Sequence, residues 1–204
     1  MKLTNIIGCM VVALGMVACS EDDGTIEEFP EWQSRNDSYF SELVSTTKEK
    51  VAAGDTSWEL LSGYNKPTKN YTLQYSDYVV VEKFEPYFDN SKETDMPLLT
   101  DTVEVHYRGQ LLTSANAYKT SGLVFDSSYS GDFDPVVATP VKLAVKSVVS
   151  GFGTALLHMH RGDHWKIYIP YQLGYSAATK GSIPAYSTLI FDLRLEDFWS
   201  REDE

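Results

Sequence analysis

The spacing of apolar residues changes along the chain and divides it into segments of different structure. Near the N-terminus, apolar residues run almost without a break from Ile6 to Val17. From Phe29 to Ala53 they recur near the helical period of 3.6 residues, and Gly54 then provides a stop. This second segment is predicted to be an amphipathic helix. Its apolar stripe either packs on the domain that follows or contacts a partner or a second copy.

The rest of the chain has the pattern of short strands. Residues 54–70 have the glycine, proline and small polar residues of a loop, interrupted by the short apolar piece Trp58–Leu61. Residues 29–70 are therefore predicted to form a helical extension. Stretches rich in β-branched and aromatic residues follow, and these read as strands. They are Tyr71–Tyr75, Tyr78–Phe84, Thr102–Tyr107, Leu123–Ser127, Val141–Val145, Trp165–Ile169 and Thr188–Phe198. Because only one short helix, Phe152–His160, interrupts them, residues 71–204 are predicted to be an α+β domain with an antiparallel sheet wrapped around that helix.

Composition sets limits on the partners of this domain. The chain has 204 residues, of which 43% are hydrophobic, enough for one domain with a core and an extension. Lys and Arg number 17 against 29 Asp and Glu, which gives a net charge of -12. Nucleic acids are bound by clustered cations, so this charge argues against a nucleic-acid partner and for a solvated surface.

The N-terminal apolar run predicts a leader segment. Lys2 precedes the run, which is shorter than the ~20 residues that a membrane-spanning helix needs. It ends in Met16-Val17-Ala18-Cys19, which resembles the lipobox of bacterial lipoproteins. Residues 1–18 are therefore predicted to be a signal peptide and Cys19 to carry lipid. The alternative is an ordinary secretory signal that contains a cysteine by chance.

The predicted lipid places the protein in the cell envelope, at the outer membrane on its periplasmic face or at the cell surface, with the lipid as the membrane contact. Residues 19–28 then form an acidic tether, which is either a plain linker or a signal for surface export. The other cysteine, Cys9, lies in the leader, so no thiol remains for a disulfide, a metal site or catalysis.

Neither a metal nor a cofactor is predicted. His158, His160 and His164 are spaced so that their side chains do not converge on one point. The chain also has neither a glycine-rich loop for phosphate nor the sharp strand-to-helix turn of a nucleophilic serine.

A series of motifs in the second half of the chain carries a family resemblance. The motifs are Val105–Gly109, Val124–Ser128, Val148–Phe152, Met159–Gly162, Ile169–Tyr175 and Ile183–Asp192. In content and order they resemble the FK506-binding-protein-type (FKBP-type) peptidyl-prolyl cis-trans isomerases. The resemblance covers residues 76–198, about three fifths of the chain. It implies the FKBP-like fold, with the N-terminal helix as an extension.

The resemblance also implies a proline pocket and the residues that form it. Tyr107, Asp126 and Tyr175 would be catalytic. The Tyr175 hydroxyl and the Val149 backbone N–H would bond to carbonyls of the bound peptide, and Asp126 would act electrostatically. The substrate-binding residues would be Phe125, Val141, Val148, Val149, Phe152, Ile183 and Phe191. Read without the family, each of these is an ordinary core or strand residue. The family commonly has an aromatic residue where Val141 stands, tryptophan at Phe152 and glycine at Ser176.

The implied activity is rotation about the bond that precedes a proline in a polypeptide. Amide resonance opposes this rotation by about 18–20 kcal/mol, and a dry apolar pocket with hydrogen bonds to the twisted amide lowers the barrier without any covalent step. Proline-containing polypeptides, such as folding envelope or surface proteins, would be the substrates, and the family also implies binding of FK506-like macrolides. The alternatives are a chaperone or peptide-binding module with low activity, and a surface lipoprotein that contacts host or glycan partners.

Overall fold

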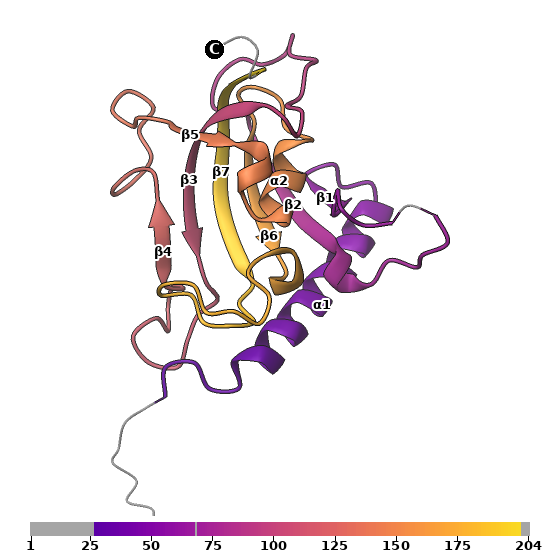
Figure 1. Ribbon diagram of the computed structural model, residues 1–204, viewed down its shortest axis with the longest axis vertical. Helices are drawn as coiled ribbons and strands as arrows, with labels where there is room; N and C mark the ends of the chain where they lie inside the picture. Colours follow the sequence, from indigo (N-terminus) through magenta and orange to yellow (C-terminus); the bar gives the residue numbers. More distant parts are fainter. Residues whose placement is uncertain (1–26, 68, 201–204) are drawn as a thin grey trace, which may run out of the picture.

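The computed structural model describes residues 27–67 and 69–200, and its centre is one antiparallel sheet of seven strands (Figure 1). The predicted signal peptide, Cys19 and most of the predicted tether lie outside the described residues. The strands are β1 (Trp58–Ser62), β2 (Tyr78–Phe84), β3 (Thr102–Gln110), β4 (Val124–Ser127), β5 (Val141–Ala144), β6 (His164–Ile169) and β7 (Leu189–Trp199). The helices are α1 (Trp32–Ala52) and α2 (Ser150–Leu156), with short 3-10 turns η1 (Tyr75–Asp77), η2 (Val145–Ser147) and η3 (Tyr171–Leu173).

The strand order is β1-β2-β6-β7-β3-β4, and β5 pairs with the first half of β3 while β4 pairs with its end. The long strands β3 and β7 pair along their whole length, from Thr102 opposite Trp199 to Gln110 opposite Ile190. This sheet and its two helices confirm the predicted α+β class with an N-terminal helix. The sheet begins at β1, ahead of the domain boundary predicted at residue 70.

One predicted strand is wrong, because Tyr71–Tyr75 forms no strand. Asp77 is the physical reason. Its carboxylate accepts hydrogen bonds from the Gln74 N–H (2.8 Å) and the Tyr71 hydroxyl (2.9 Å), and it pairs with Lys66 at 2.8 Å. These side-chain bonds replace strand pairing and fold the segment into turn η1.

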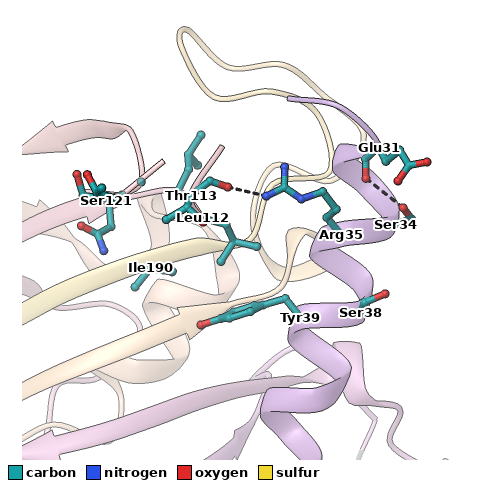
Figure 2. A pocket seen from close by; sticks show the side chains of 13 residues that line it. Glu31, Ser34, Arg35, Ser38, Tyr39, Leu112, Thr113, Ser121 and Ile190 are labelled. Carbon is teal, nitrogen blue, oxygen red and sulfur yellow. Dashed lines mark hydrogen bonds between the residues drawn. The ribbon is translucent and has the colours of Figure 1, made fainter. Parts of the chain in front are cut away.

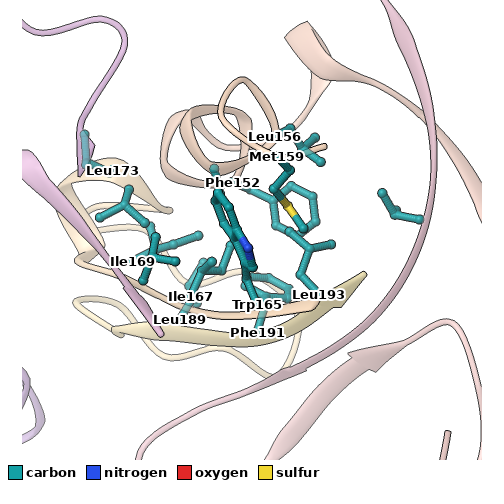
Figure 3. Packing of buried hydrophobic residues seen from close by; sticks show 14 of the residues in the cluster. Phe152, Leu156, Met159, Trp165, Ile167, Ile169, Leu173, Leu189, Phe191 and Leu193 are labelled. Atoms are coloured by element: carbon teal, nitrogen blue, oxygen red, sulfur yellow. The ribbon is translucent and has the colours of Figure 1, made fainter. Parts of the chain in front are cut away.

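The sheet separates two apolar clusters, one on each face. Alternation along β7 directs Leu189, Phe191 and Leu193 toward α2 and Ile190 toward α1. We call these the inner and the outer face. The inner cluster is the larger one, and Figure 3 shows Phe152 and Leu156 of α2 packed over Phe191 and Leu193.

Helix α1 packs on the outer face of its own chain, which confirms the first alternative for its apolar stripe. Phe40 and Val44 contact the cluster that contains Val80, Tyr168 and Ile190, from β2, β6 and β7. At its N-terminal end, the Trp32 indole N–H donates to the Ser187 hydroxyl at 2.8 Å. Within residues 27–67 and 69–200, no helix is both long and apolar enough to cross a membrane.

Candidate active site

A cavity of ≈ 380 Å³ opens on the inner face, between the start of α2 and the ends of β3 and β4. Its walls combine aromatic, aliphatic and a few polar side chains, as small-molecule and peptide sites do. The lining residues are Tyr107, Asp126, Leu143, Ser147, Val148, Val149, Phe152, Tyr175, Lys180 and Phe191. Seven of these ten are predicted site residues, so the fold brings most of the predicted set together.

The floor of the cavity is aromatic. The rings of Phe152 and Phe191 lie edge to face with centroids 5.0 Å apart, and Tyr107 lies 6.1 Å from each of them. A glycine permits this packing, because a Cβ atom at Gly109 would lie 2.6 Å from the rings of Phe125 and Phe191. The edge-to-face contacts hold the rings in place, so the floor is a preformed apolar surface of the size of a small ring.

Tyr107 and Asp126 form the polar pair of the site. The Tyr107 hydroxyl donates a hydrogen bond of 2.9 Å to Oδ2 of Asp126. Strand pairing sets this contact, because Asp126 lies opposite Gly109, two residues along β3 from Tyr107. Burial, followed by the bond to Asp126, raises the pKa of Tyr107 to about 12. The phenol therefore stays protonated at neutral pH, and the exposed carboxylate of Asp126 remains at the mouth of the cavity.

Two further donors stand at the rim. Val149 precedes the first residue of α2, and Tyr175 follows turn η3 on the other side of the cavity. Among the described residues, neither the Val149 backbone N–H nor the Tyr175 hydroxyl has a hydrogen-bond partner. Both are therefore available to carbonyl groups of a ligand. Ser176 beside Tyr175 has a φ of 54°, a left-handed conformation that favours the glycine expected there from the family pattern.

Three predicted residues do not line this cavity. Phe125 packs against the floor, with its ring 5.4 Å from that of Phe191. Val141 pairs with Val105 near the start of β5, and Ile183 is 5% exposed within the inner core. Their predicted substrate contacts stay predictions.

Leu143, Ser147 and Lys180 line the cavity and are missing from the predicted set. The sequence contained a signal for Leu143. Because side chains alternate along a strand, Leu143 shares a face with the predicted residue Val141 and is closer to α2 along the chain. Ser147 and Lys180 lie in η2 and in the loop after Tyr175, where the sequence has no periodicity to follow.

The histidines near α2 have separate partners. His158 Nδ1 lies 2.8 Å from the carbonyl oxygen of Thr154, and His164 Nε2 lies 3.0 Å from Asp192 on the outer face. Within the described ranges, no group of three or more His, Cys, Asp and Glu side chains is placed to hold a metal ion.

The fold and the cavity define a protein with a short helix packed against an antiparallel sheet and a small site with an aromatic floor between them. Residues 93–196 match the family of FKBP-type peptidyl-prolyl cis-trans isomerases. Because the match spans half of the chain, the chain belongs to this family, and the predicted family is confirmed.

Individual proteins and one solved structure are also similar to this chain. The FKBP-type 22 kDa peptidyl-prolyl cis-trans isomerase of Escherichia coli (strain K12) is 36% identical over 107 residues, 52% of this chain and 45% of the relative. The macrophage infectivity potentiator of Trypanosoma cruzi is 37% identical over 100 residues, 48% of this chain and 44% of the relative. The chain thus spans less than half the length of these two curated relatives. The crystal structure of FkpA from Escherichia coli superposes with a TM-score of 0.47 and 23% identity, over 83% of this chain and 65% of that one.

Proposed function

We propose that this protein is a peptidyl-prolyl cis-trans isomerase that acts on proline-containing polypeptides by noncovalent stabilisation of the twisted amide. The observation that carries the proposal is the cavity on the inner face. It joins an aromatic floor, the Tyr107–Asp126 pair and two unengaged donors within one small site.

Each part of the cavity has a role in this mechanism. The proline ring rests on Phe152, which is 4% exposed and framed by Tyr107 and Phe191. Burial of the ring keeps water from the amide, so the carbonyl loses its solvent hydrogen bonds while the bond rotates.

The rim donors replace those lost bonds. The Val149 N–H and the Tyr175 hydroxyl hold carbonyls of the peptide on either side of the proline. Asp126, oriented by the Tyr107 hydroxyl, presents negative charge to the amide as its conjugation to nitrogen is lost. No bond is formed or broken, and no proton is transferred, because rotation alone separates the two isomers.

The isomerase activity is tested by NMR, which measures exchange between the cis and trans forms of an X-Pro peptide in the presence of the purified protein. Tyr175→Phe should lower kcat/KM about tenfold, since it removes one hydrogen bond made in the transition state. Tyr64→Phe is the matched control, because Tyr64 is an exposed tyrosine that does not line the cavity. An exchange rate equal to that of the free peptide with the unaltered protein would exclude the enzyme.

A peptide-binding module with little turnover is the alternative that the same experiment separates. Such a module would broaden or shift the peptide signals without faster exchange.

We further propose that FK506-like macrolides occupy the same cavity, because they would present a ring and carbonyl groups to the same floor and donors. Competition between FK506 and the X-Pro peptide tests this, and binding of both at once would contradict it.

We also propose that the protein works in the cell envelope, anchored by lipid on Cys19, where it assists the folding of envelope or surface proteins. The apolar leader and the Met16–Cys19 motif support this proposal. Cys19→Ala should move the protein from the membrane fraction to the soluble fraction of its host. Cys9→Ala, within the leader, is the matched control and should leave the protein with the membranes. Equal partitioning of the two variants would contradict lipidation at Cys19.

A further inference from the structure

A second cavity lies on the outer face of the sheet. It is opposite the inner-face cavity proposed to bind proline, which we call the proline cavity. The outer cavity has a volume of ≈ 360 Å³. Alternation along β7 separates the two sites, because Phe191 points into the proline cavity and Asp192 into this one. The lining residues are Phe84, Arg108, Gln110, Tyr129, Asp132, Phe133, Lys166, Asp192 and Arg194.

A row of charged residues crosses the sheet in this cavity. Lys166 on β6 and Arg108 on β3 are the direct cross-strand neighbours of Asp192 on β7. The Asp192 carboxylate nevertheless bonds elsewhere, to His164 at 3.0 Å and to Arg194. Desolvation raises the pKa of Asp192, but the bonds to His164 and Arg194 outweigh it and hold this pKa below its usual range. Asp192 is therefore ionised and already satisfied.

Among the described residues, neither flanking cation has a carboxylate within ion-pairing distance, although Glu82 on β2 lies opposite Lys166 on its other side. Within residues 27–67 and 69–200, neither Arg108 nor Lys166 takes part in an ion pair. Arg108 donates to the Gly131 carbonyl at 3.0 Å, and Lys166 lies 5.5 Å from the centroid of the Tyr168 ring. Both side chains are half-buried, so their charges are only partly hydrated. An anion in the cavity would supply the missing partner.

The local charge is opposite in sign to that of the molecule. Three cations, Arg108, Lys166 and Arg194, line the cavity with two carboxylates, whereas the whole chain has a net charge of -12. Arg194 is 9% exposed, lies 4.1 Å from the centroid of the Phe133 ring and is paired with Asp192, so Arg108 and Lys166 carry the unpaired positive charge.

The walls of the cavity are aromatic. Phe84 is 41% exposed, and Tyr129 lies with its ring centroid 5.5 Å from the Arg108 guanidinium. Aromatic walls suit an apolar body, and a guanidinium beside an ammonium suits a carboxylate. Gln110 also lines a larger groove of ≈ 710 Å³ between α1 and the segment that follows β3. Figure 2 shows Arg35 of α1 donating to the Thr113 carbonyl in that groove.

We propose that this outer cavity is a second binding site, which takes a carboxylate attached to an apolar or aromatic group. The carboxylate would lie over Asp192, whose own charge is engaged by His164 and Arg194, and would pair with Arg108 and Lys166 on either side. The apolar group would lie between Phe84 and Tyr129. Such a ligand is either a free aromatic acid or an acidic residue next to an aromatic one in a polypeptide. The site is independent of the proline cavity and of turnover there.

The test is an NMR titration of the ¹⁵N-labelled protein with two probes, benzoate and a proline-free peptide that contains Phe-Glu and has an amidated C-terminus. Saturable shifts around Arg108 and Lys166, without shifts around Tyr175, are expected for at least one probe. Binding of benzoate alone identifies a free acid as the ligand. Binding of the peptide, lost when Glu is replaced by Gln in that peptide, identifies a polypeptide.

Variants decide whether the named cations are responsible. Lys166→Gln and Arg108→Gln should each raise the Kd of the bound probe about tenfold, as expected for loss of a charge-assisted hydrogen bond. Lys92→Gln is the matched control, since it removes the same charge from an exposed site outside the cavity. Two results would overturn the proposal: no saturation with either probe by roughly 20 mM, or equal weakening by Lys92→Gln and the two cavity variants. Dispersed NMR spectra of either cavity variant suffice to establish that it folds.

Discussion

His106 lies on the outer face of β3 with 2% of its surface exposed. Its Nε2 is 3.7 Å from Glu196 Oε2, and Nδ1 has no hydrogen-bond partner among the described residues. Desolvation lowers the pKa of His106 below its ordinary 6.5, and Arg194 also lowers it, whereas Glu196 and Glu104 oppose this shift. The rings of Tyr87 and Phe133 close the site from the loops above. The folded state therefore prefers the neutral imidazole.

A pH dependence of stability follows from this preference. The unfolded chain binds a proton at His106 more readily than the folded one, so this contribution to stability is present above pH 6.5 and is lost as the pH falls toward the lower folded pKa. The free energy of unfolding, measured with urea at pH 7.5 and at pH 5, should fall less between these pH values for His106→Gln than for the unaltered protein. His158→Gln, at an exposed histidine, should keep the full loss, and identical pH curves for all three proteins would refute the assignment.

At the scale of elements, α1 is joined to the sheet by a buried amide. Asn36 Oδ1 accepts a hydrogen bond of 2.7 Å from the Thr188 N–H, and its Nδ2 donates to the Trp32 carbonyl at 2.7 Å. Both residues of the first bond are completely buried. Removal of the amide would leave the Thr188 N–H without a partner and away from water.

Asn36→Ala should therefore lower the free energy of unfolding by about 1–3 kcal/mol. The rate of prolyl exchange should persist, because α1 and the proline cavity lie on opposite faces of the sheet. Chemical denaturation measures the first quantity and NMR exchange the second. Ser41→Ala on the exposed side of the same helix is the control and should change stability by less than about 0.5 kcal/mol. An equal effect of the two substitutions would mean that α1 does not dock through Asn36.

At the scale of the whole molecule, the chain has a net charge of -12. The inner cavity itself is lined by one carboxylate, Asp126, and one ammonium, Lys180. The long-range field should therefore favour cationic substrates, although the local charges nearly balance. An X-Pro peptide flanked by lysines should have a higher kcat/KM than its glutamate-flanked counterpart at low salt. The difference should shrink toward unity near 1 M salt, where the Debye length is about 3 Å. A preference that salt does not change would point to contacts within the cavity instead.

The sequence by itself determined the class, the family and most of the residues that line the inner cavity. Period-two patterns located most strands, and the motifs around Tyr107, Phe152 and Tyr175 identified most of the residues that line the proline cavity. These features are local, because strand alternation and turn residues depend on near neighbours in the chain. Aromatic residues that line a site also carry the same local signal as core residues, which is why the family order of the motifs was needed to separate them.

Only the tertiary structure decided which face of the sheet each helix covers and which residues meet in the cavity on the outer face. The strand predicted at Tyr71–Tyr75 is replaced by a turn held by bonds to Asp77, and β1 is a short apolar piece within a stretch predicted to be a loop. The outer cavity brings together Phe84, Arg108, Lys166 and Arg194 from four strands. No local pattern contains that grouping, because strand register between distant segments sets which charges become neighbours and which of them lack a partner.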